Sequence, residues 1–211
     1  QTLIYDKSKV LYGFDKAKME IRKSNFTILV EGYMDLIMSH QAGVKNTVAV
    51  SGTAMTRDHL NILKRLSDNI YTCFDMDSAG DKATKRAIDM ALADEFNVKV
   101  VTVPSGKDPA DFVLEHPDKW AEEISKAQNF MDFYFDNILA RHDKNSAEGK
   151  KNISKILLSQ IKKIKNRIEQ SHWLALLSQK IKVKPSLLEE EMARISNEDF
   201  LPRSDGAMPL K

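Results

Sequence analysis

Four short runs of mostly apolar residues constrain the fold of this chain more than any other feature. They are F-T-I-L-V (26–30), T-V-A-V (47–50), I-Y-T-C-F (70–74) and V-K-V-V-T-V (98–103). Continuous apolar runs of this length, rich in β-branched residues, are typical of strands buried on both faces of a parallel sheet. Segments of helical character separate the runs, so the pattern predicts βαβ units and an α/β fold.

The pattern changes after Pro104, where no further run predicts a strand. Apolar residues recur at helical spacing through 117–142 and 147–182, and Pro185 opens a last helix that we expect to run through Ile195. The predicted organisation is a basic lead-in segment (1–24), an α/β domain (25–115), a helical subdomain (116–196) and a tail (197–211). The tail holds two prolines and a glycine, so we expect it to be disordered.

Composition narrows the setting and the chemistry. The single cysteine, Cys73, excludes a disulfide framework and a cysteine-based zinc site within the 211 residues. A lone cysteine inside an apolar run fits a reducing, cytoplasmic compartment. No apolar run approaches the roughly 20 residues that cross a bilayer, so we expect no membrane partner. The net charge of +2 hides a basic segment at 141–170, which carries nine Lys and Arg against three acids.

Acidic residues follow three of the predicted strands. Glu31 comes directly after the first apolar run, Asp75 directly after the third, and Asp77 two residues later; Asp108 follows the fourth after a short turn. Because ligands bind beyond the carboxyl ends of parallel strands, these side chains would meet at one edge of the sheet. Carboxylates that close repel one another unless a cation joins them. Oxygen ligands without Cys or His favour Mg²⁺ or Mn²⁺, which suits phosphate chemistry.

A purely structural interpretation of the same residues stays open. Asp and Gly after strands are ordinary turn residues. Asp77 or Ser78 could simply cap the helix that follows. The residues alone do not choose between a metal site and a set of turns and caps.

Several motifs resemble one protein family. The stretches L-V-E-G-Y-M-D (29–35) and F-D-M-D-S-A-G (74–80) together resemble the TOPRIM fold. The full E-G-Y-M-D string and K-S-K-V-L-Y-G-F (7–14) are similar to bacterial DnaG-type primases, as are the S-G-T of 51–53 and K-D-P-A-D-F-V (107–113). The stretch 167–183 resembles the helical subdomain of those enzymes. The resemblance implies a TOPRIM-like, Rossmannoid parallel sheet with helices on both faces, followed by an all-α subdomain.

The resemblance also implies an activity. Primases of this family are DNA-directed RNA polymerases, that is, nucleotidyltransferases. They join ribonucleoside triphosphates into short RNA primers on single-stranded DNA, using Mg²⁺ or Mn²⁺. Carried over residue by residue, Glu31, Asp75 and Asp77 match the central acidic triad, and Asp35 and Asp108 match further metal-site positions. Glu31 would act as a metal ligand or as the base that receives the hydroxyl proton.

Basic residues are the candidates for contact with nucleotide or nucleic acid. The resemblance implies this role for Lys7, and Lys9 lies close to it in sequence. Lys82, Lys85 and Arg86 share a face of the helix expected after the D-x-D. A solvated helix face remains an equal alternative for that set. For the basic run at 150–167 the solvated face is favoured, because its lysines interleave with an apolar stripe as on any amphipathic helix.

The resemblance further implies that these residues are part of a longer enzyme. The family's zinc-binding domain and helicase-binding domain have no counterpart that we recognise in the 211 residues, so zinc and the replicative helicase are expected to bind outside this chain. The chain alone should show little or no primer synthesis. Two departures from the family pattern are Met76 within the D-x-D and Ala110 in place of an acid. The alternatives are a TOPRIM nuclease or topoisomerase piece, and a non-catalytic TOPRIM module that binds nucleic acid.

Overall fold

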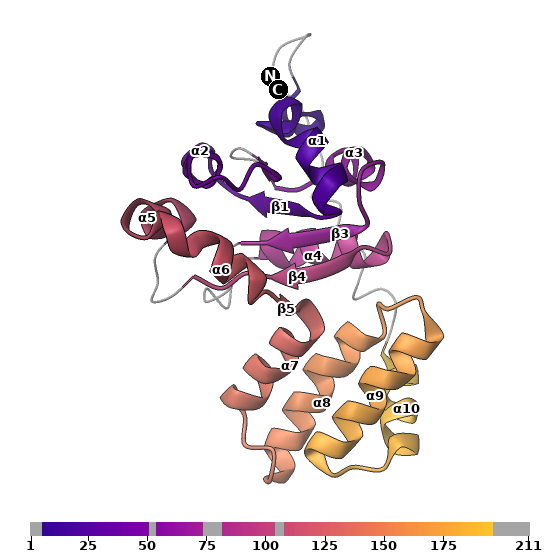
Figure 1. Ribbon diagram of the computed structural model, residues 1–211. Helices are drawn as coiled ribbons and strands as arrows, with labels where there is room; N and C mark the ends of the chain where they lie inside the picture. The colour runs from indigo at the N-terminus through magenta and orange to yellow at the C-terminus, as the bar shows by residue number, and fades with distance from the viewer. Residues whose placement is uncertain (1–5, 51–53, 74–81, 104–107, 196–211) are drawn as a thin grey trace, which may run out of the picture. The chain divides into compact units, whose positions relative to one another are not determined.

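The computed structural model describes residues 6–50, 54–73, 82–103 and 108–195 (Figure 1). It forms two compact units, Gln1–Asn137 and Ile138–Lys211, and each is described by itself. The sequence predicts a boundary between the α/β domain and the helical subdomain at residues 115 and 116, and this boundary stays a prediction. The tail predicted to be disordered, 197–211, lies outside the described residues.

The first unit contains a sheet and its flanking helices. Its strands are β1 (Thr27–Val30), β2 (Thr47–Ala49), β3 (Asn69–Thr72), β4 (Asn97–Val100) and β5 (Gln128–Asn129). Its helices are η1 (Lys7–Lys9), α1 (Phe14–Ser24), α2 (Tyr33–Gln41), α3 (Arg57–Lys64), α4 (Lys82–Ala93), α5 (Pro109–Glu115), η3 (Pro117–Lys119) and α6 (Trp120–Ser125), followed by α7 (Phe130–Arg141), which ends in the second unit.

The sheet has the strand order β2-β1-β3-β4-β5. The first four strands are mutually parallel, with Leu29 of β1 opposite Val48 of β2 and Thr72 of β3. Each lies within or overlaps one of the four apolar runs, so the predicted parallel α/β sheet is confirmed. β5 pairs antiparallel to β4, and the expectation of no strand after Pro104 is wrong. Its two residues are polar and exposed, so they carry no hydrophobic pattern.

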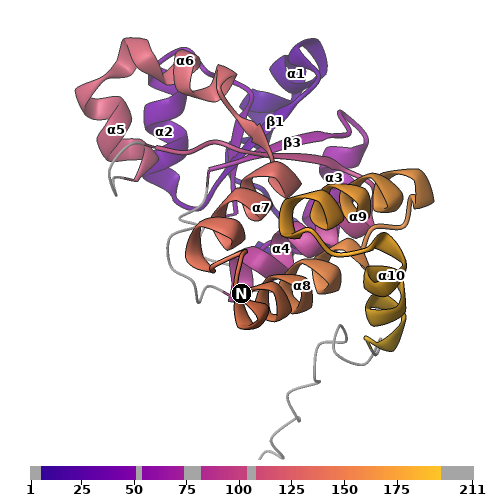
Figure 2. The same ribbon diagram turned by 90° about the horizontal axis from the view of Figure 1, so that it is seen from below.

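Helices cover both faces of the sheet (Figure 2). One core cluster joins Ile28 and Val30 of β1 to Leu36 of α2, Phe112 of α5 and Trp120 of α6. The helices α3 and α4 lie on the opposite side of the strands (Figure 2). This division follows from the two-residue period of a strand, which turns the side chains before and after Leu29 to the same face. The core therefore fixes α2 and α5 beside each other at the sheet.

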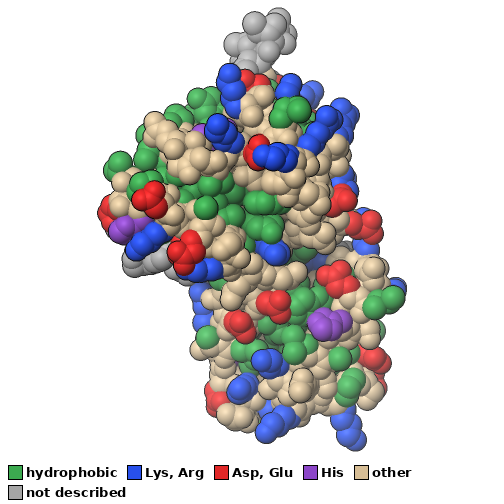
Figure 3. Space-filling view, in the orientation of Figure 1, with side chains coloured by type: hydrophobic (Ala, Val, Ile, Leu, Met, Phe, Trp, Pro, Cys, Tyr) green, Lys and Arg blue, Asp and Glu red, His purple; other side chains and the backbone are tan. Residues whose placement is uncertain are grey.

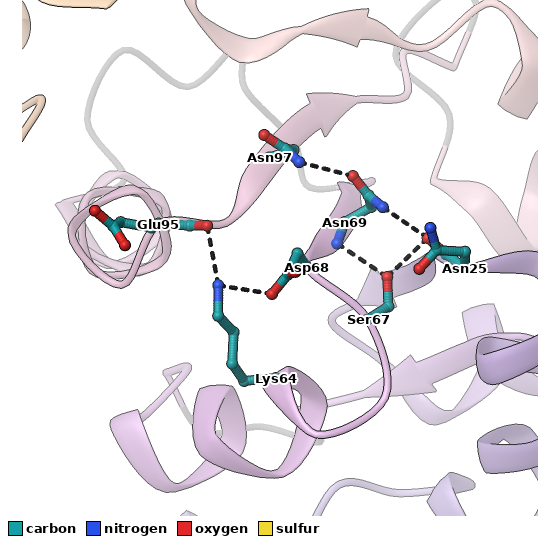
Figure 4. A network of polar contacts seen from close by, with 7 residues as sticks. All are labelled: Asn25, Lys64, Ser67, Asp68, Asn69, Glu95 and Asn97. Atoms are coloured by element: carbon teal, nitrogen blue, oxygen red, sulfur yellow. Dashed lines mark hydrogen bonds and ion pairs between the residues drawn. The ribbon is translucent and has the colours of Figure 1, made fainter. Parts of the chain in front are cut away.

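A polar network closes the amino-terminal edge of the sheet (Figure 4). The backbone carbonyl of Asn25 accepts hydrogen bonds from Ser67 Oγ at 2.7 Å and from Asn69 Nδ2 at 2.8 Å. Lys64 Nζ lies 2.8 Å from the Asp68 carboxylate and donates to the carbonyl of Glu95 at 3.0 Å. These polar groups use one another as hydrogen-bond or ion-pair partners. Ligands of a parallel sheet bind at the opposite edge, beyond the carboxyl ends of the strands.

The second unit is helical throughout its described residues. After the end of α7 it contains α8 (Ala147–Ile161), α9 (Arg167–Ile181) and α10 (Pro185–Arg194). Ile153 and Leu157 of α8, Leu177 of α9 and Leu188 of α10 are buried at 2% exposure or less. The helical region predicted after the α/β part is confirmed. None of the described helices has the length and apolarity needed to span a membrane.

A prediction concerns Gly149, in the first turn of α8. A Cβ atom there would lie 1.8 Å from the carbonyl oxygen of Asp143, in the turn before the helix. Alanine would gain up to about 1 kcal/mol of helix propensity, but it would force this turn to move, and overpacking costs about 1–3 kcal/mol. We expect Gly149→Ala to lower the free energy of unfolding measured in urea. Lys151→Ala, at an exposed position of the same helix, should stay within about 0.5 kcal/mol of wild type.

Candidate functional site

Glu31 lies at the carboxyl end of β1, next to the end of β3. Thr72 of β3 is paired with Leu29, and the backbone N–H of Cys73 donates to the Leu29 carbonyl at 3.0 Å. The two strands therefore end side by side, and the Glu31 side chain is exposed there. Asp75 and Asp77 follow β3 in the sequence but lie outside the described residues. Their convergence with Glu31 stays a prediction.

Asp35 joins two helices through its carboxylate. Its Oδ2 accepts a hydrogen bond from the backbone N–H of Gly32 at 2.9 Å, and its Oδ1 accepts from the N–H of Ala110 at 3.1 Å. The side chain thus fixes the turn after Glu31 and ties α2 to the first turn of α5. Only 9% of the residue is exposed. Ala110 stands where the family pattern has an acid, but this contact does not depend on the side chain, because the donor is the backbone N–H.

The pKa of the Asp35 carboxyl is raised, first by burial and then by the nearby acids Asp108 and Asp111; the two N–H donors oppose the rise. A raised folded-state pKa means that the folded protein holds the proton more tightly than the unfolded chain. The resulting stability is present below pH 3.8, the ordinary value, and is lost as the pH rises through the folded-state pKa. The two hydrogen bonds from Gly32 and Ala110 favour the ionised form of the carboxyl.

Asp108 caps α5. Its Oδ1 accepts a hydrogen bond from the backbone N–H of Asp111 at 2.7 Å, and its side chain is exposed. The sequence left two roles open for the acids after the strands, a turn or cap residue and a metal ligand. For Asp108 the structure shows the cap. Its second oxygen is left for another role.

The described part of the site contains no complete metal cluster: no group of three or more His, Cys, Asp or Glu among those residues is placed to hold an ion. The exposed Glu31 carboxylate has the chemistry of a hard-cation ligand. Asp35 fits this role less well, because each of its oxygens already accepts an N–H. Burial, and then the charge of Asp35, raises the pKa of the Cys73 thiol, so this side chain stays neutral and is unsuited to bind metal.

His59 holds the segment that carries Lys7 and Lys9. The ring is fully buried, and its Nε2 donates to the backbone carbonyl of Lys7 at 3.1 Å, while Nδ1 accepts from the N–H of Thr56 at 3.4 Å. Thr56 Oγ1 also donates to the carbonyl of Ser8 at 2.6 Å. The sequence interpretation missed this anchoring of η1 to α3.

A pH prediction follows from His59. Burial lowers its pKa below the ordinary 6.5, so its contribution to stability is present above pH 6.5 and is lost as the pH falls towards the folded-state value. We expect the free energy of unfolding to fall between pH 7 and pH 5 more steeply in wild type than in His59→Gln, which can donate to Lys7 while remaining neutral. Replacement of the exposed His172 by Gln serves as control. Equal slopes for wild type and His59→Gln would contradict this assignment.

Two of the three basic residues predicted on α4, Lys85 and Arg86, have described side chains. Lys82 begins the helix, and Lys85 and Arg86 are exposed. Lys85 Nζ lies 3.1 Å from the hydroxyl of Tyr134 and 5.3 Å from the centre of its ring. A phosphate that contacts Lys85 would therefore compete with Tyr134, whereas Arg86 has no such aromatic neighbour in the part of the chain that the structure describes.

The sequence interpretation missed an aromatic pair beside Glu31. Tyr33 begins α2, and Tyr12 pairs with Ala49 at the end of β2. Their ring centroids lie 4.6 Å apart in an edge-to-face arrangement, and each residue is 42% exposed. Hydrophobic side chains reach the surface over this part of the unit (Figure 3). Such rings can stack on nucleobases. Their signal in the sequence was one Tyr in each of two family motifs, 7–14 and 29–35.

Comparisons with known proteins agree with the fold. A family model described as Toprim-like matches residues 28–113, and a model described as the DnaB-helicase binding domain of primase matches residues 131–186. The DNA primase of Halalkalibacterium halodurans is 33% identical over 200 residues, which is 92% of this chain. The chain belongs to the bacterial DnaG-type primase family. It spans about a third of the length of the primases it matches, 33% for the H. halodurans relative and 32% for that of Enterococcus faecalis.

Solved primase structures share this architecture. A DNA primase domain from Pseudomonas aeruginosa is 29% identical with a TM-score of 0.79, covering 92% of this primase chain and 62% of that one. A DnaG primase catalytic domain bound to single-stranded DNA is 27% identical with a TM-score of 0.75, covering 89% and 61%. The TOPRIM assignment of the α/β part is confirmed.

The match at residues 131–186 differs from one expectation. We expected the region that meets the helicase to lie wholly outside this primase chain. The family model with that description instead covers the end of the first unit and most of the described second unit.

Proposed function

We propose that this chain supplies the metal-dependent nucleotidyl-transfer site of an enzyme that makes short RNA primers on single-stranded DNA. The observation that carries the proposal is the position of Glu31. It stands at the end of β1, beside the end of β3, within the residues that match the Toprim-like family. Asp75 and Asp77 follow β3 in the sequence. The family relationship supports a divalent metal, and the oxygen-only ligand set supports Mg²⁺ or Mn²⁺.

The reaction joins a 3′-hydroxyl to the α-phosphate of a ribonucleoside triphosphate and releases pyrophosphate. In the proposal, Glu31, Asp75 and Asp77 hold the divalent ions. Bound ions would lower the pKa of the attacking hydroxyl and neutralise the triphosphate. As the alternative to binding an ion, Glu31 would receive the hydroxyl proton; the exposure of its carboxylate at the strand end supports either role.

Other residues position this centre. Asp35 fixes the turn after Glu31 through its bond with Gly32 and aligns α5, which Asp108 caps. We assign Asp35 mainly a positioning role and leave the second oxygen of Asp108 as an outer metal ligand. Lys7 and Lys9, held by the His59 contact, are proposed to meet phosphate groups. Lys82, Lys85 and Arg86 provide a second basic surface for nucleotide or nucleic acid.

The proposed partners are single-stranded DNA, ribonucleoside triphosphates, the RNA primer and the replicative helicase, in the cytoplasm. The related DnaG catalytic domain that was solved bound to single-stranded DNA supports the first of these. The match to a helicase-binding family model supports the last. We propose helicase contact through the helices of residues 131–186 in addition to any region outside the chain.

The test uses a chimera, because the chain spans about a third of its relatives. Residues 1–211 replace the matching segment of the H. halodurans primase, and labelled ribonucleotides are supplied with a single-stranded DNA template. We expect short RNA products that require Mg²⁺ or Mn²⁺. Metal-dependent cutting of plasmid DNA by the 211-residue chain, without RNA synthesis by the chimera, would favour the nuclease alternative instead.

A further inference from the structure

A basic cavity of about 520 Å³ lies in the second unit, where α8, α9 and α10 meet. Its lining comes from the α8–α9 loop, the first turn of α9 and the later turns of α10: Lys162, Lys163, Ile164, Lys165, Arg167, Gln170, Glu189, Met192 and Ala193. Four of these residues are Lys or Arg and one is Glu, so the lining carries an excess of three positive charges.

Gln170 builds the wall of this cavity. The side chain is buried, with 7% of the residue exposed, and its Nε2 donates to the carbonyls of Ile161 at 3.2 Å and Ile164 at 3.4 Å. Its Oε1 accepts from a terminal nitrogen of Arg167 at 3.0 Å. One buried amide thus fixes the α8–α9 loop and orients the guanidinium of Arg167 in the cavity lining.

Around the cavity, backbone carbonyls already accept hydrogen bonds, whereas two of the cations have no carboxylate partner among the described residues. The loop carbonyls of Ile161 and Ile164 are occupied by Gln170, and the Ile195 carbonyl accepts a bond from Lys162 Nζ. Lys165 and Arg167 are exposed, and within the described part of the chain neither is paired with a carboxylate. The cavity therefore offers donors and positive charge, which is the chemistry that recognises phosphate.

We infer that this cavity binds the phosphodiester backbone of single-stranded nucleic acid. The inference rests on the proposed function and adds a contact that the acidic site does not supply. The cavity volume is within the roughly 300–1,000 Å³ typical of ligand sites, which exceeds the needs of one phosphate. The four Lys and Arg residues of the lining all fall within residues 162–167, so several positive charges are available to one strand. Ile164 and Met192, which belong to the lining, supply apolar surface for sugar or base.

The test is fluorescence anisotropy of a labelled oligo-dT with the full 211-residue chain, measured across a salt series. The pocket variant is Lys165→Ala/Arg167→Ala. The matched control is Lys151→Ala/Lys155→Ala, which removes the same charge from exposed positions of α8 outside the cavity lining. We expect the pocket variant to bind about 10-fold more weakly at low salt and to lower the salt slope by about 1.4, for two phosphate contacts at about 0.7 each. The control should change affinity less than about twofold, because it touches no phosphate in this scheme.

Equal losses in the two double variants, or no loss in either, would overturn the inference. Competition separates the other sources of negative charge. If poly-glutamate displaces the oligonucleotide as well as unlabelled DNA of equal charge does, the site takes acidic protein segments; if inorganic pyrophosphate does so, it takes free phosphates. Either result would also overturn the inference. Mn²⁺ titration of the pocket variant reports separately on the acidic site, so a failure of the proposed function would appear there and not in the DNA titration.

Discussion

Asp35→Ala is expected to lower the free energy of unfolding by about 2–6 kcal/mol. The substitution leaves the partly buried N–H groups of Gly32 and Ala110 without their acceptor, and an unsatisfied donor costs up to about 1–3 kcal/mol where it is shielded from water. It also releases α2 from the first turn of α5, so the turn that follows Glu31 loses its support. Urea unfolding followed by circular dichroism measures the change.

Two controls separate this bridge from a general effect of charge. Asp111→Ala removes an exposed acid from the same turn of α5 and should stay within about 0.5 kcal/mol of wild type. Asp35→Asn keeps one carbonyl oxygen but turns an NH₂ group towards the second donor, so it should recover only part of the loss. Wild-type stability in Asp35→Ala would show that the two hydrogen bonds contribute nothing net and would remove the positioning role.

Glu31→Gln is expected to reduce primer synthesis by the chimera about 100-fold or more. Glutamine keeps the size of the side chain but removes the negative charge that would hold a divalent ion or accept a proton. Loss of one preorganised electrostatic group costs roughly 2.7–4 kcal/mol of transition-state stabilisation in other enzymes. Incorporation of labelled ribonucleotide, measured at saturating Mg²⁺ and again at saturating Mn²⁺, gives the rate.

The matched control for Glu31 is Asp118→Asn, which neutralises an exposed acid of η3. It should leave the rate unchanged within about twofold, because a lone exposed charge contributes little. Unfolding of both variants in urea checks that the fold is retained. A Glu31→Gln chimera that works at the rate of the control would exclude this carboxylate from the chemistry.

Strands β1 and β2 were predictable from the sequence because every residue of both is buried, which requires a nearly continuous apolar run. Strands β3 and β4 bury only alternate residues, but each overlaps an apolar run long enough to predict a strand. Strand β5 could not be predicted from the sequence, because it is a two-residue edge strand of Gln128 and Asn129 that is defined only by its pairing with β4. Helix α1 was also not predicted, because its residues were assigned to the basic lead-in segment. It buries Ala17 and Ile21, but charged residues dominate its sequence.

The part of the candidate site at the strand ends could be predicted from the sequence. The part that depends on contacts between residues far apart in the sequence could not. Glu31 could be placed because it follows β1 directly. The bridge from Asp35 to Ala110 joins residues 75 positions apart, so no local pattern predicts it. The anchoring of Lys7 by His59 spans 52 positions and was missed for the same reason. Such contacts depend on how the helices pack across the sheet, which the periodicity of one segment does not specify.

The central claim is that Glu31, Asp75 and Asp77 share a divalent ion, and calorimetric titration of Mn²⁺ tests it most directly. The comparison is between wild type and Asp75→Ala, with Asp118→Asn as the charge-matched control. The account predicts saturable binding to wild type and to the control, and a loss of most of that binding in Asp75→Ala. Binding of the same affinity and stoichiometry in all three proteins would contradict it.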